Sequence, residues 1–257
     1  MRRAILMFLP AVLCAASVYA QPYPAKPIRI IVGTSAGGGV DTISRILGQK
    51  LPEQLGQQVV VENRPGAGGA VGSELVAKSP RDGYTLLTIS IAYAVIPSSH
   101  RNLPYDPVND LAPVAVLVNA PNLLAVHPSL PVRSVRELVQ LARAKPDELT
   151  YASSGNGSPA HLASELLNLL AGIKLVHVPY KGTSAGMVDL VAGRVSIMVG
   201  SVLSTMPHAR AGKVRVLATT GGRRAEAVPE LPTIAEAGVK GYAVDVWYAL
   251  FVPTGTA

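Results

Sequence analysis

The pentapeptide Gly-Thr-Ser-Ala-Gly occurs twice in this sequence, at residues 33–37 and 182–186, each time after an apolar run and ahead of a Val-Asp pair. A serine in Gly-x-Ser-x-Gly is the nucleophile of many hydrolases. Glycine-rich turns between a strand and a helix also bind phosphates and other anions. Ser35 and Ser184 are therefore candidate nucleophiles or candidate hydrogen-bond donors to an anion.

The surroundings of Ser35 argue against a nucleophile. A nucleophile elbow passes directly from serine into its helix, whereas three glycines, residues 37–39, delay the predicted helix to about Asp41. No His-Gly-Gly oxyanion sequence precedes the serine, and none of the five histidines stands in a metal-ligand pattern: 100, 127, 161, 177 and 208. A secreted serine hydrolase using Ser35 or Ser184 stays the alternative function.

Nucleotide-binding motifs are also incomplete around the first pentapeptide. A Walker loop needs Lys followed by Ser or Thr after its second glycine, and Gly39-Val40 stands there. A dinucleotide fingerprint beginning at Gly37 lacks its third glycine, because that position is Thr42. We therefore predict no cofactor and no metal.

The first twenty residues predict the compartment. They combine Arg2 and Arg3 with an apolar stretch that is too short to span a membrane, and then a small-residue site that predicts cleavage after Ala20. This is the pattern of a secretory signal peptide, so we expect a periplasmic protein. The only cysteine, Cys14, lies within residues 1–20, and the mature chain is expected to have neither disulfide nor thiol.

Charge and composition limit the partners. The net charge is +7, and loss of Arg2 and Arg3 leaves 21 basic against 16 acidic residues, or +5. The basic residues are scattered and aromatic residues make up only 5% of the chain, which disfavours nucleic-acid binding. A mildly basic secreted protein is better suited to attracting small anions.

Hydrophobic periodicity predicts an α/β fold, since short β-branched runs alternate with amphipathic segments. The predicted strands are 28–32, 57–62, 84–90, 114–118, 122–127, 149–152, 174–178, 195–199 and 214–219. The predicted helices are 41–51, 70–78, 134–144, 159–171, 185–192 and 202–211. A proline-rich loop at 103–113 separates two such series, which favours two lobes over a single large doubly wound sheet.

Four of the turns between strands and helices are rich in glycine and small polar residues. In parallel α/β folds, ligands bind beyond the carboxyl ends of the strands, where helix N-termini point. Glycine lets the backbone approach a ligand closely, and free amides at a helix start favour an anion. The turns are 33–41, 63–72, 153–159 and 180–186.

From about Tyr23 onward the sequence resembles the Bug-type periplasmic solute receptors of tripartite tricarboxylate transport systems. The resemblance rests on the order and spacing of several segments rather than on one motif. They are AGGGVDTISRILGQKLPEQLGQQVVVENRPGAGG, SPRDGYTLL, YDPVNDLAPV, YASSGNGSPAHLASELL, VHVPYKG and LPTIAEAG.

The resemblance implies two Rossmann-like lobes of the type II periplasmic-binding-protein architecture, joined by a two-segment hinge. Lobe 1 would comprise 21–122 and 246–257, and lobe 2 would comprise 123–245. It further implies a monomeric, non-catalytic receptor for a small carboxylate, with a possible inner-membrane tripartite permease as partner. A ligand-sensing input protein for a signalling partner would share this ligand chemistry and stays open.

The resemblance also implies which residues contact the ligand. They are main-chain amides, hydroxyls and loop side chains of both lobes, with Asp41 the family's aspartate and His161 just inside its helix. The candidates are Ser35, Ala36, Gly37, Gly38, Asp41, Ser90, Ile91, Ala92, Ser154, Gly155, Asn156, Gly157, Ser158, His161, Tyr180, Lys181, Gly182 and Thr183.

Three positions depart from the family pattern. Gly33-Thr34 stands where relatives carry Pro and a pocket-walling aromatic residue, and Ala185 stands where many carry Pro. The sequence also stops at Ala257, where relatives continue with helices that return to the first lobe. We therefore expect the C-terminal helices of lobe 1 to be missing, and a chain extended through them to melt at a higher temperature.

Overall fold

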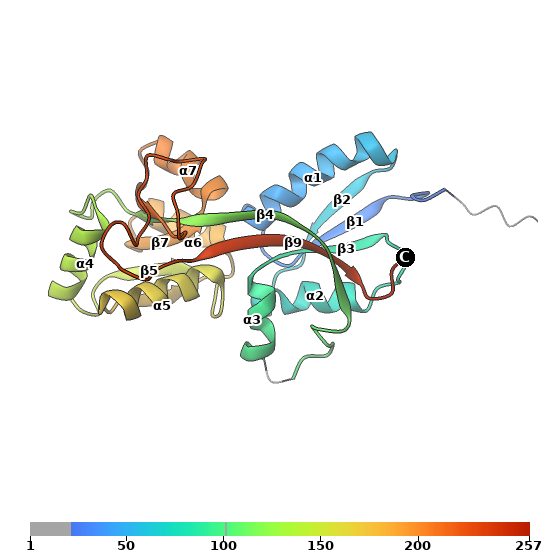
Figure 1. The fold of residues 1–257 in the computed structure, drawn as a ribbon, viewed down its shortest axis with the longest axis horizontal. Coiled ribbons are helices and arrows are strands. Elements are labelled where there is room, and N and C mark those ends of the chain that lie inside the picture. Colours follow the sequence, from blue (N-terminus) through green and yellow to red (C-terminus); the bar gives the residue numbers. More distant parts are fainter. Residues whose placement is uncertain (1–21, 101) are drawn as a thin grey trace, which may run out of the picture.

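The computed structural model describes residues 22–100 and 102–257, which form two α/β lobes connected by two long strands (Figure 1). The predicted signal peptide and its cleavage after Ala20 lie outside the described residues. Within the described part of the chain, no helix is both long and apolar enough to cross a membrane.

The first lobe is built around three parallel strands. Strand β1, which is apolar except for Arg29, pairs with β2 on one side and with β3 on the other. Runs of this kind are typical of strands that helices cover on both faces. The elements are β1 (Ile28–Val32), α1 (Gly39–Leu55), β2 (Val59–Asn63), η1 (Ala67–Gly69), α2 (Ala70–Ala77), β3 (Thr85–Ser90) and α3 (Ala92–Ser99).

The second lobe repeats this arrangement, with β5 between the parallel strands β6 and β7. Its best-predicted element is α5, because Ser158, Pro159 and Gly172 supply the cap, the first helical residue and the left-handed C-cap. The elements are α4 (Val135–Ala144), β5 (Thr150–Ser153), α5 (Pro159–Ala171), β6 (Val176–Pro179), α6 (Thr183–Val191), β7 (Ile197–Ser201), α7 (Val202–Arg210) and β8 (Arg215–Thr219).

Two antiparallel strands, β4 (Leu111–Val126) and β9 (Asp245–Pro253), cross between the lobes side by side (Figure 1). The strand order is β2-β1-β3-β9-β4-β7-β5-β6, with β8 also paired to β4. The strands of both lobes therefore form one continuous hydrogen-bonded sheet, and the sheet curls so that each lobe contains one half of it.

The prediction of two strands at 114–118 and 122–127 is wrong. They form the single strand β4, whose pairing to β9 shifts register between Pro113 and Ala115 and again between Val116 and Val118. At these two points β-bulges accommodate the extra residues of β4 that have no partner in a regular ladder with β9. Long-range pairing to β9 therefore overrides the local turn signal.

Each lobe has its own hydrophobic cores on the two faces of its sheet. In lobe 1, Ile30 and Val32 point into one core, while Ile31, Leu87 and Ile89 belong to another. In lobe 2 the larger core is formed by β4, α4, β5 and α5, and the second lies under α6. Burying one large aliphatic side chain contributes about 1.5–3 kcal/mol, so each lobe has its own source of stability.

Candidate functional site

A cavity of about 590 Å³ lies between the lobes and is lined by turns from both of them. Helix N-termini of both lobes reach it, among them those of α1, α5, α6 and α7. Their first or capping residues in the lining are Gly38, Gly39, Ser158, Pro159, Gly182, Thr183 and Ser201.

Most of the residues predicted from the sequence line this cavity. The structure brings together Ser35, Gly38, Ser90, Ala92, Ser154, Gly155, Asn156, Gly157, Ser158, Tyr180, Lys181, Gly182 and Thr183. Five other candidates are not among the lining residues: Ala36, Gly37, Asp41, Ile91 and His161. Asp41 and His161 instead bond to the backbone of the loops that form the lining.

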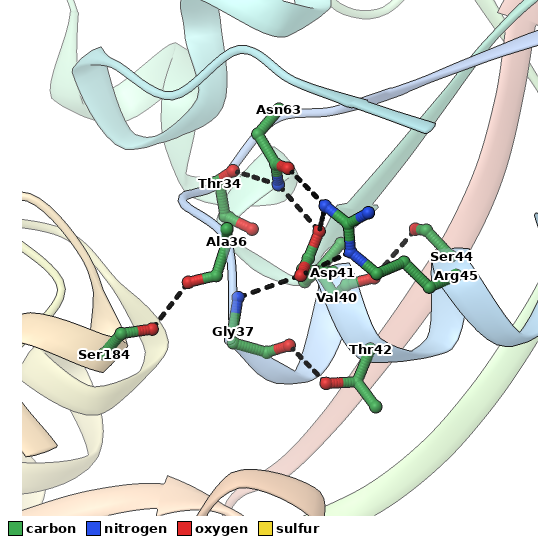
Figure 2. Close-up of polar contacts among 11 residues, drawn as sticks. Thr34, Ala36, Gly37, Val40, Asp41, Thr42, Ser44, Arg45, Asn63 and Ser184 are labelled. Carbon is green, nitrogen blue, oxygen red and sulfur yellow. Dashed lines mark hydrogen bonds and ion pairs between the residues drawn. The ribbon is translucent and has the colours of Figure 1, made fainter. Parts of the chain in front are cut away.

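Asp41 organises the first-lobe loop (Figure 2). Its carboxylate accepts hydrogen bonds from the Gly37 amide at 2.9 Å, from Asn63 Nδ2 at 2.9 Å and from Arg45 Nε at 3.0 Å. Asn63 Nδ2 also donates to the Thr34 carbonyl at 3.1 Å. The buried carboxylate thus ties the loop to the end of β2.

Helix α1 begins at Gly39 with Gly38 as its N-cap, so it starts two residues before Asp41, where the sequence predicts the helix to begin. The Asp41 carboxylate orders the loop at 37–39 through its bond to the Gly37 amide. Burial alone would raise the pKa of Asp41, but hydrogen bonds from Arg45, Gly37 and Asn63 outweigh it and hold that pKa below its usual value.

His161 and Ser158 hold the first loop of lobe 2. The Ser158 side chain accepts from the His161 amide at 3.3 Å, and His161 Nδ1 accepts from the Gly157 amide at 3.1 Å. This reciprocal pair resembles a capping box, with an imidazole in place of a carboxylate. The two side chains thus fix the conformation of the loop between β5 and α5.

Below this loop three aromatic side chains form a stack. The ring centroids of His161 and His177 are 4.2 Å apart, and those of His177 and Tyr151 are 4.9 Å apart. His177 Nε2 shares a 2.6 Å hydrogen bond with Ser153 Oγ, which in turn accepts from the Gly155 amide at 3.0 Å. Burial, and then the neighbouring His161, lower the pKa of His177.

The turn before α6 places Lys181 at the cavity. Tyr180 is held by a 2.7 Å hydrogen bond from its hydroxyl to Asp189, and its amide donates to the Ser153 carbonyl at 3.0 Å. Lys181 and His100 are the lining side chains that can carry positive charge, and no Asp or Glu is among the described residues that line the cavity. The cavity therefore favours an anion electrostatically.

The two pentapeptide serines do not have the geometry of nucleophiles. Ser184 Oγ donates to the Ala36 carbonyl at 2.5 Å, across the gap between the lobes. Among the described residues, no histidine side chain hydrogen-bonds to Ser35 or Ser184. The serines whose hydroxyl groups bond to a histidine ring are Ser99, Ser129 and Ser153. The expectation that Ser184 donates to a trapped anion is corrected, because its hydroxyl is committed to the opposite lobe.

Sequence reasoning missed six polar residues of the lining: Thr34, Ser99, His100, Asn122, Ser201 and Tyr248. Asn122 comes from β4, Ser201 caps α7, and Tyr248 comes from β9. Asn122 is only 6% exposed, and its side-chain amide has no hydrogen bond to any described residue. Two signals were available: an Asn within an apolar strand, and a Ser at a strand end ahead of a helix. The lining also includes 65–69, from a glycine-rich turn that the site prediction left out.

Residues 43–257 match the sequence profile described as "Tripartite tricarboxylate transporter family receptor". The chain belongs to this family. The resemblance inferred from the sequence is thereby confirmed, and the protein is a receptor of the tripartite tricarboxylate transporter type. Its predicted α/β fold with two lobes is confirmed as well by the structures below.

Individual relatives agree with this assignment. The receptor is 38% identical over 252 residues to protein BugT of Bordetella pertussis, covering 97% of this chain and 77% of BugT. It superimposes on an R. palustris structure described as containing adipate, with a TM-score of 0.87, 38% identity and coverage of 91% and 79% of the two chains. MatC from Rhodopseudomonas palustris with bound malate gives a TM-score of 0.82, 32% identity and coverage of 91% and 80%.

Proposed function

We propose that this receptor captures a small organic anion with at least one carboxylate in the cavity between its lobes, and presents it to a tripartite permease of the inner membrane. The observation that carries the proposal is the convergence of helix N-termini from both lobes on one cavity whose described lining contains Lys181 and His100 but no carboxylate. The protein acts by binding, without catalysis, in the periplasm.

Recognition by main-chain amides suits a carboxylate. The N-terminal amides of a helix lack partners within the helix and carry the positive end of its dipole. Asn122 adds a buried amide side chain, and Ser35, Ser90 and Thr183 add hydroxyls to the lining. Such donors bind a carboxylate without a dedicated arginine clamp, so they tolerate different carbon skeletons.

The two solved relatives support the ligand class, since one is described with adipate and the other with malate. Both ligands are dicarboxylates of small size. The cavity here, at about 590 Å³, also has room for a larger acid. Thr34 lines the cavity at the position where an aromatic wall was expected, which favours a broad range of ligands.

We also infer how the receptor is processed, where its lobes begin and end, and its oligomeric state. Residues 1–20 act as a signal peptide cleaved after Ala20. Lobe 1 comprises 21–122 and 246–257, and lobe 2 comprises 123–245. Supporting this division, the lobe 1 cores draw on β1, β3 and β9, while the lobe 2 cores draw on the chain between β4 and Val244. The receptor acts as a monomer.

A thermal-shift screen of residues 21–257 tests the ligand class. The panel contains adipate, malate, larger dicarboxylates and aromatic acids, with the matching amides as neutral controls. At a ligand concentration about 100 times the Kd, binding adds about 2.7 kcal/mol, which raises the Tm of a domain this size by about 5–10 °C.

We expect at least one acid to raise the Tm while its amide does not. A shift produced only by amines or sugars would overturn the anion assignment. Replacing Asn122 with Asp would place a carboxylate in the cavity, and we expect it to abolish the shift without lowering the Tm of the free protein by a comparable amount.

A further inference from the structure

The glycine run after the first pentapeptide lies against hydroxyl groups of the other lobe. A Cβ built on Gly37 would lie 2.6 Å from Ser184 Oγ, and one built on Gly39 would meet the Tyr248 hydroxyl of β9 first and would lie 2.9 Å from Ser201 Oγ. Between them, a Cβ on Gly38 would lie 3.6 Å from Thr183 Oγ1. Three consecutive glycines of lobe 1 thus face three hydroxyls from the starts of α6 and α7.

The relation is reciprocal on the other side of the gap. Gly182 opens the second pentapeptide in an extended conformation, and a Cβ there would lie 2.6 Å from Ser35 Cβ. The three atoms nearest to that position all belong to Ser35. Each pentapeptide therefore presents a serine to a glycine of the other pentapeptide, and Ser184 adds a 2.5 Å hydrogen bond to the Ala36 carbonyl.

We propose that these two segments form a closure seam, defined by Ser35, Ala36, Gly37, Gly182 and Ser184, and that Ser184 is the positioning residue that latches the lobes together. The glycines are required because any side chain would hold the backbones apart. The hydrogen bond then supplies a directional contact at the point of closest approach. Ser184 and Gly37 lie outside the cavity lining, so the latch acts on the lobes and not on the ligand.

The seam explains features that ligand binding alone leaves unexplained. A loop that only offers amides to an anion does not need Gly182, whose backbone is extended, to be free of a side chain toward the opposite lobe. Serine and glycine also lose little side-chain entropy when they become ordered. Closure through this seam therefore costs little, and the closed form is populated before ligand binds.

Distance measurements between two spin labels test the seam without any ligand. The only cysteine of the sequence is Cys14, so a chain beginning at Gln21 carries labels only where cysteines are introduced. Gln54 in α1 and Gln140 in α4 are exposed and lie in different lobes. The variant with Gln54→Cys and Gln140→Cys is expected to show a short distance that matches the closed structure, together with a longer one.

Three substitutions then act on the seam. Ser184→Ala is expected to lower the ratio of closed to open molecules about threefold to tenfold, as loss of one hydrogen bond predicts. Gly182→Ala is expected to remove the short distance, because its Cβ collides with Ser35. Ser35→Gly in the Gly182→Ala background is expected to restore the short distance, since the nearest remaining atom, the Cα at position 35, is 3.8 Å away.

Matched controls leave the seam intact. Ser79→Ala removes a hydroxyl that donates to a carbonyl within lobe 1, and Gly222→Ala adds a Cβ at an ordinary 3.6 Å contact within lobe 2. Neither should change the distribution of distances. A wild-type chain with no short distance, or a Gly182→Ala variant that keeps it, would overturn the proposal. Failure of the carboxylate screen leaves these outcomes unchanged, so the two proposals fail separately.

Discussion

The two copies of Gly-Thr-Ser-Ala-Gly have the same residues and different structures. The first copy is a loop: Ser35 precedes α1, and Gly37 has a left-handed φ of 79°. The second copy starts a helix, with Thr183 as the first residue of α6, and Gly186 packs within that helix against Ala152. The residues that follow each pentapeptide account for the difference.

In the first copy, those residues are two more glycines and then Asp41, whose carboxylate holds the Gly37 amide. In the second copy the next residue is Met187, which belongs to α6 and is buried in the hydrophobic core that this helix covers. The helix therefore begins within the pentapeptide. The conformation of a glycine-rich turn before a helix can therefore be fixed in two ways: by a buried carboxylate of that helix, or by packing of the helix onto a sheet. The following five predictions test this comparison.

Asp41→Ala should give the largest effect, because the substitution leaves Asn63 and Arg45 without the carboxylate they share. We expect a loss of about 2–3 kcal/mol in the free energy of unfolding, measured by urea denaturation. Asp189→Ala in α6 is the matched change on the second lobe, where the carboxylate binds Tyr180 and Arg194 at the surface. It should cost less; an equal loss would contradict the difference between the two loops.

The Asp41 contribution should also depend on pH. Because the folded state holds the pKa of Asp41 below its usual value, its stabilisation is present above the unfolded-state pKa and is lost as pH falls through the folded-state pKa. The stability difference between wild type and Asp41→Asn is therefore expected to shrink between pH 7 and pH 3. A constant difference would show that the charge is not what stabilises the loop.

The glycine at the fifth position of each pentapeptide gives the third test. Gly37→Ala forces a left-handed φ on a residue with a Cβ, which costs about 1–2 kcal/mol, and the new Cβ also meets Ser184. Gly186→Ala places a Cβ 3.1 Å from Ala152 Cβ, and the gain in helix propensity offsets this crowding to within about 1 kcal/mol. Thermal melts should rank Gly37→Ala as the less stable variant, and the reverse order would refute the structural distinction.

The residue directly before the second pentapeptide is the cationic Lys181, whereas the residue directly before the first pentapeptide is the uncharged Val32. Lys181→Met is expected to weaken binding of an anionic ligand by about threefold to fivefold, because the side chain is exposed and its charge is screened by solvent. Isothermal titration with the best acid from the thermal-shift screen measures this change. Lys174→Met, an exposed change outside the cavity lining, is the control.

The smallest effect concerns the stack under the second-lobe loop. The pKa of His177 is lower in the folded protein than in the unfolded chain. As pH falls below the unfolded-state pKa, His177 is therefore protonated in the unfolded chain while it is still neutral in the folded protein, and this stabilises the unfolded chain. Wild-type stability should decline from pH 7 toward pH 5, and His177→Gln should flatten that decline. The groups facing His177 are His161, Glu165, Tyr151 and Ser153. An unchanged slope in the variant would exclude His177 as the titrating group.

Local signals in the sequence were sufficient for much of the fold. Helix α5 was predicted at its observed bounds because Ser158, Pro159 and Gly172 mark both ends chemically. Helix α3 was not predicted, since its sequence is apolar, includes Pro97 and has no capping side chain. Strand β4 was split in two because its continuity depends on β9, more than a hundred residues away in the sequence.

The same limit applies to the site. Turns rich in glycine are visible in the sequence, and most of their residues do line the cavity. Asn122 and Tyr248 reach it only because β4 and β9 pass between the lobes, which no local pattern indicates. The contact between the pentapeptides is likewise a consequence of how two distant turns meet. What the sequence could predict was the chemistry of each turn, but not which turn each one faces.

The bond from Ser184 to the Ala36 carbonyl has an evolutionary consequence. Its acceptor belongs to the main chain, so a change of side chain at position 36 leaves the acceptor in place, and the codon for residue 184 determines whether a hydroxyl donor is present. Threonine at that position would keep a hydroxyl, whereas alanine is a single nucleotide change from many serine codons. Selection can therefore adjust how long this receptor stays shut through one codon, whose residue lies outside the cavity lining.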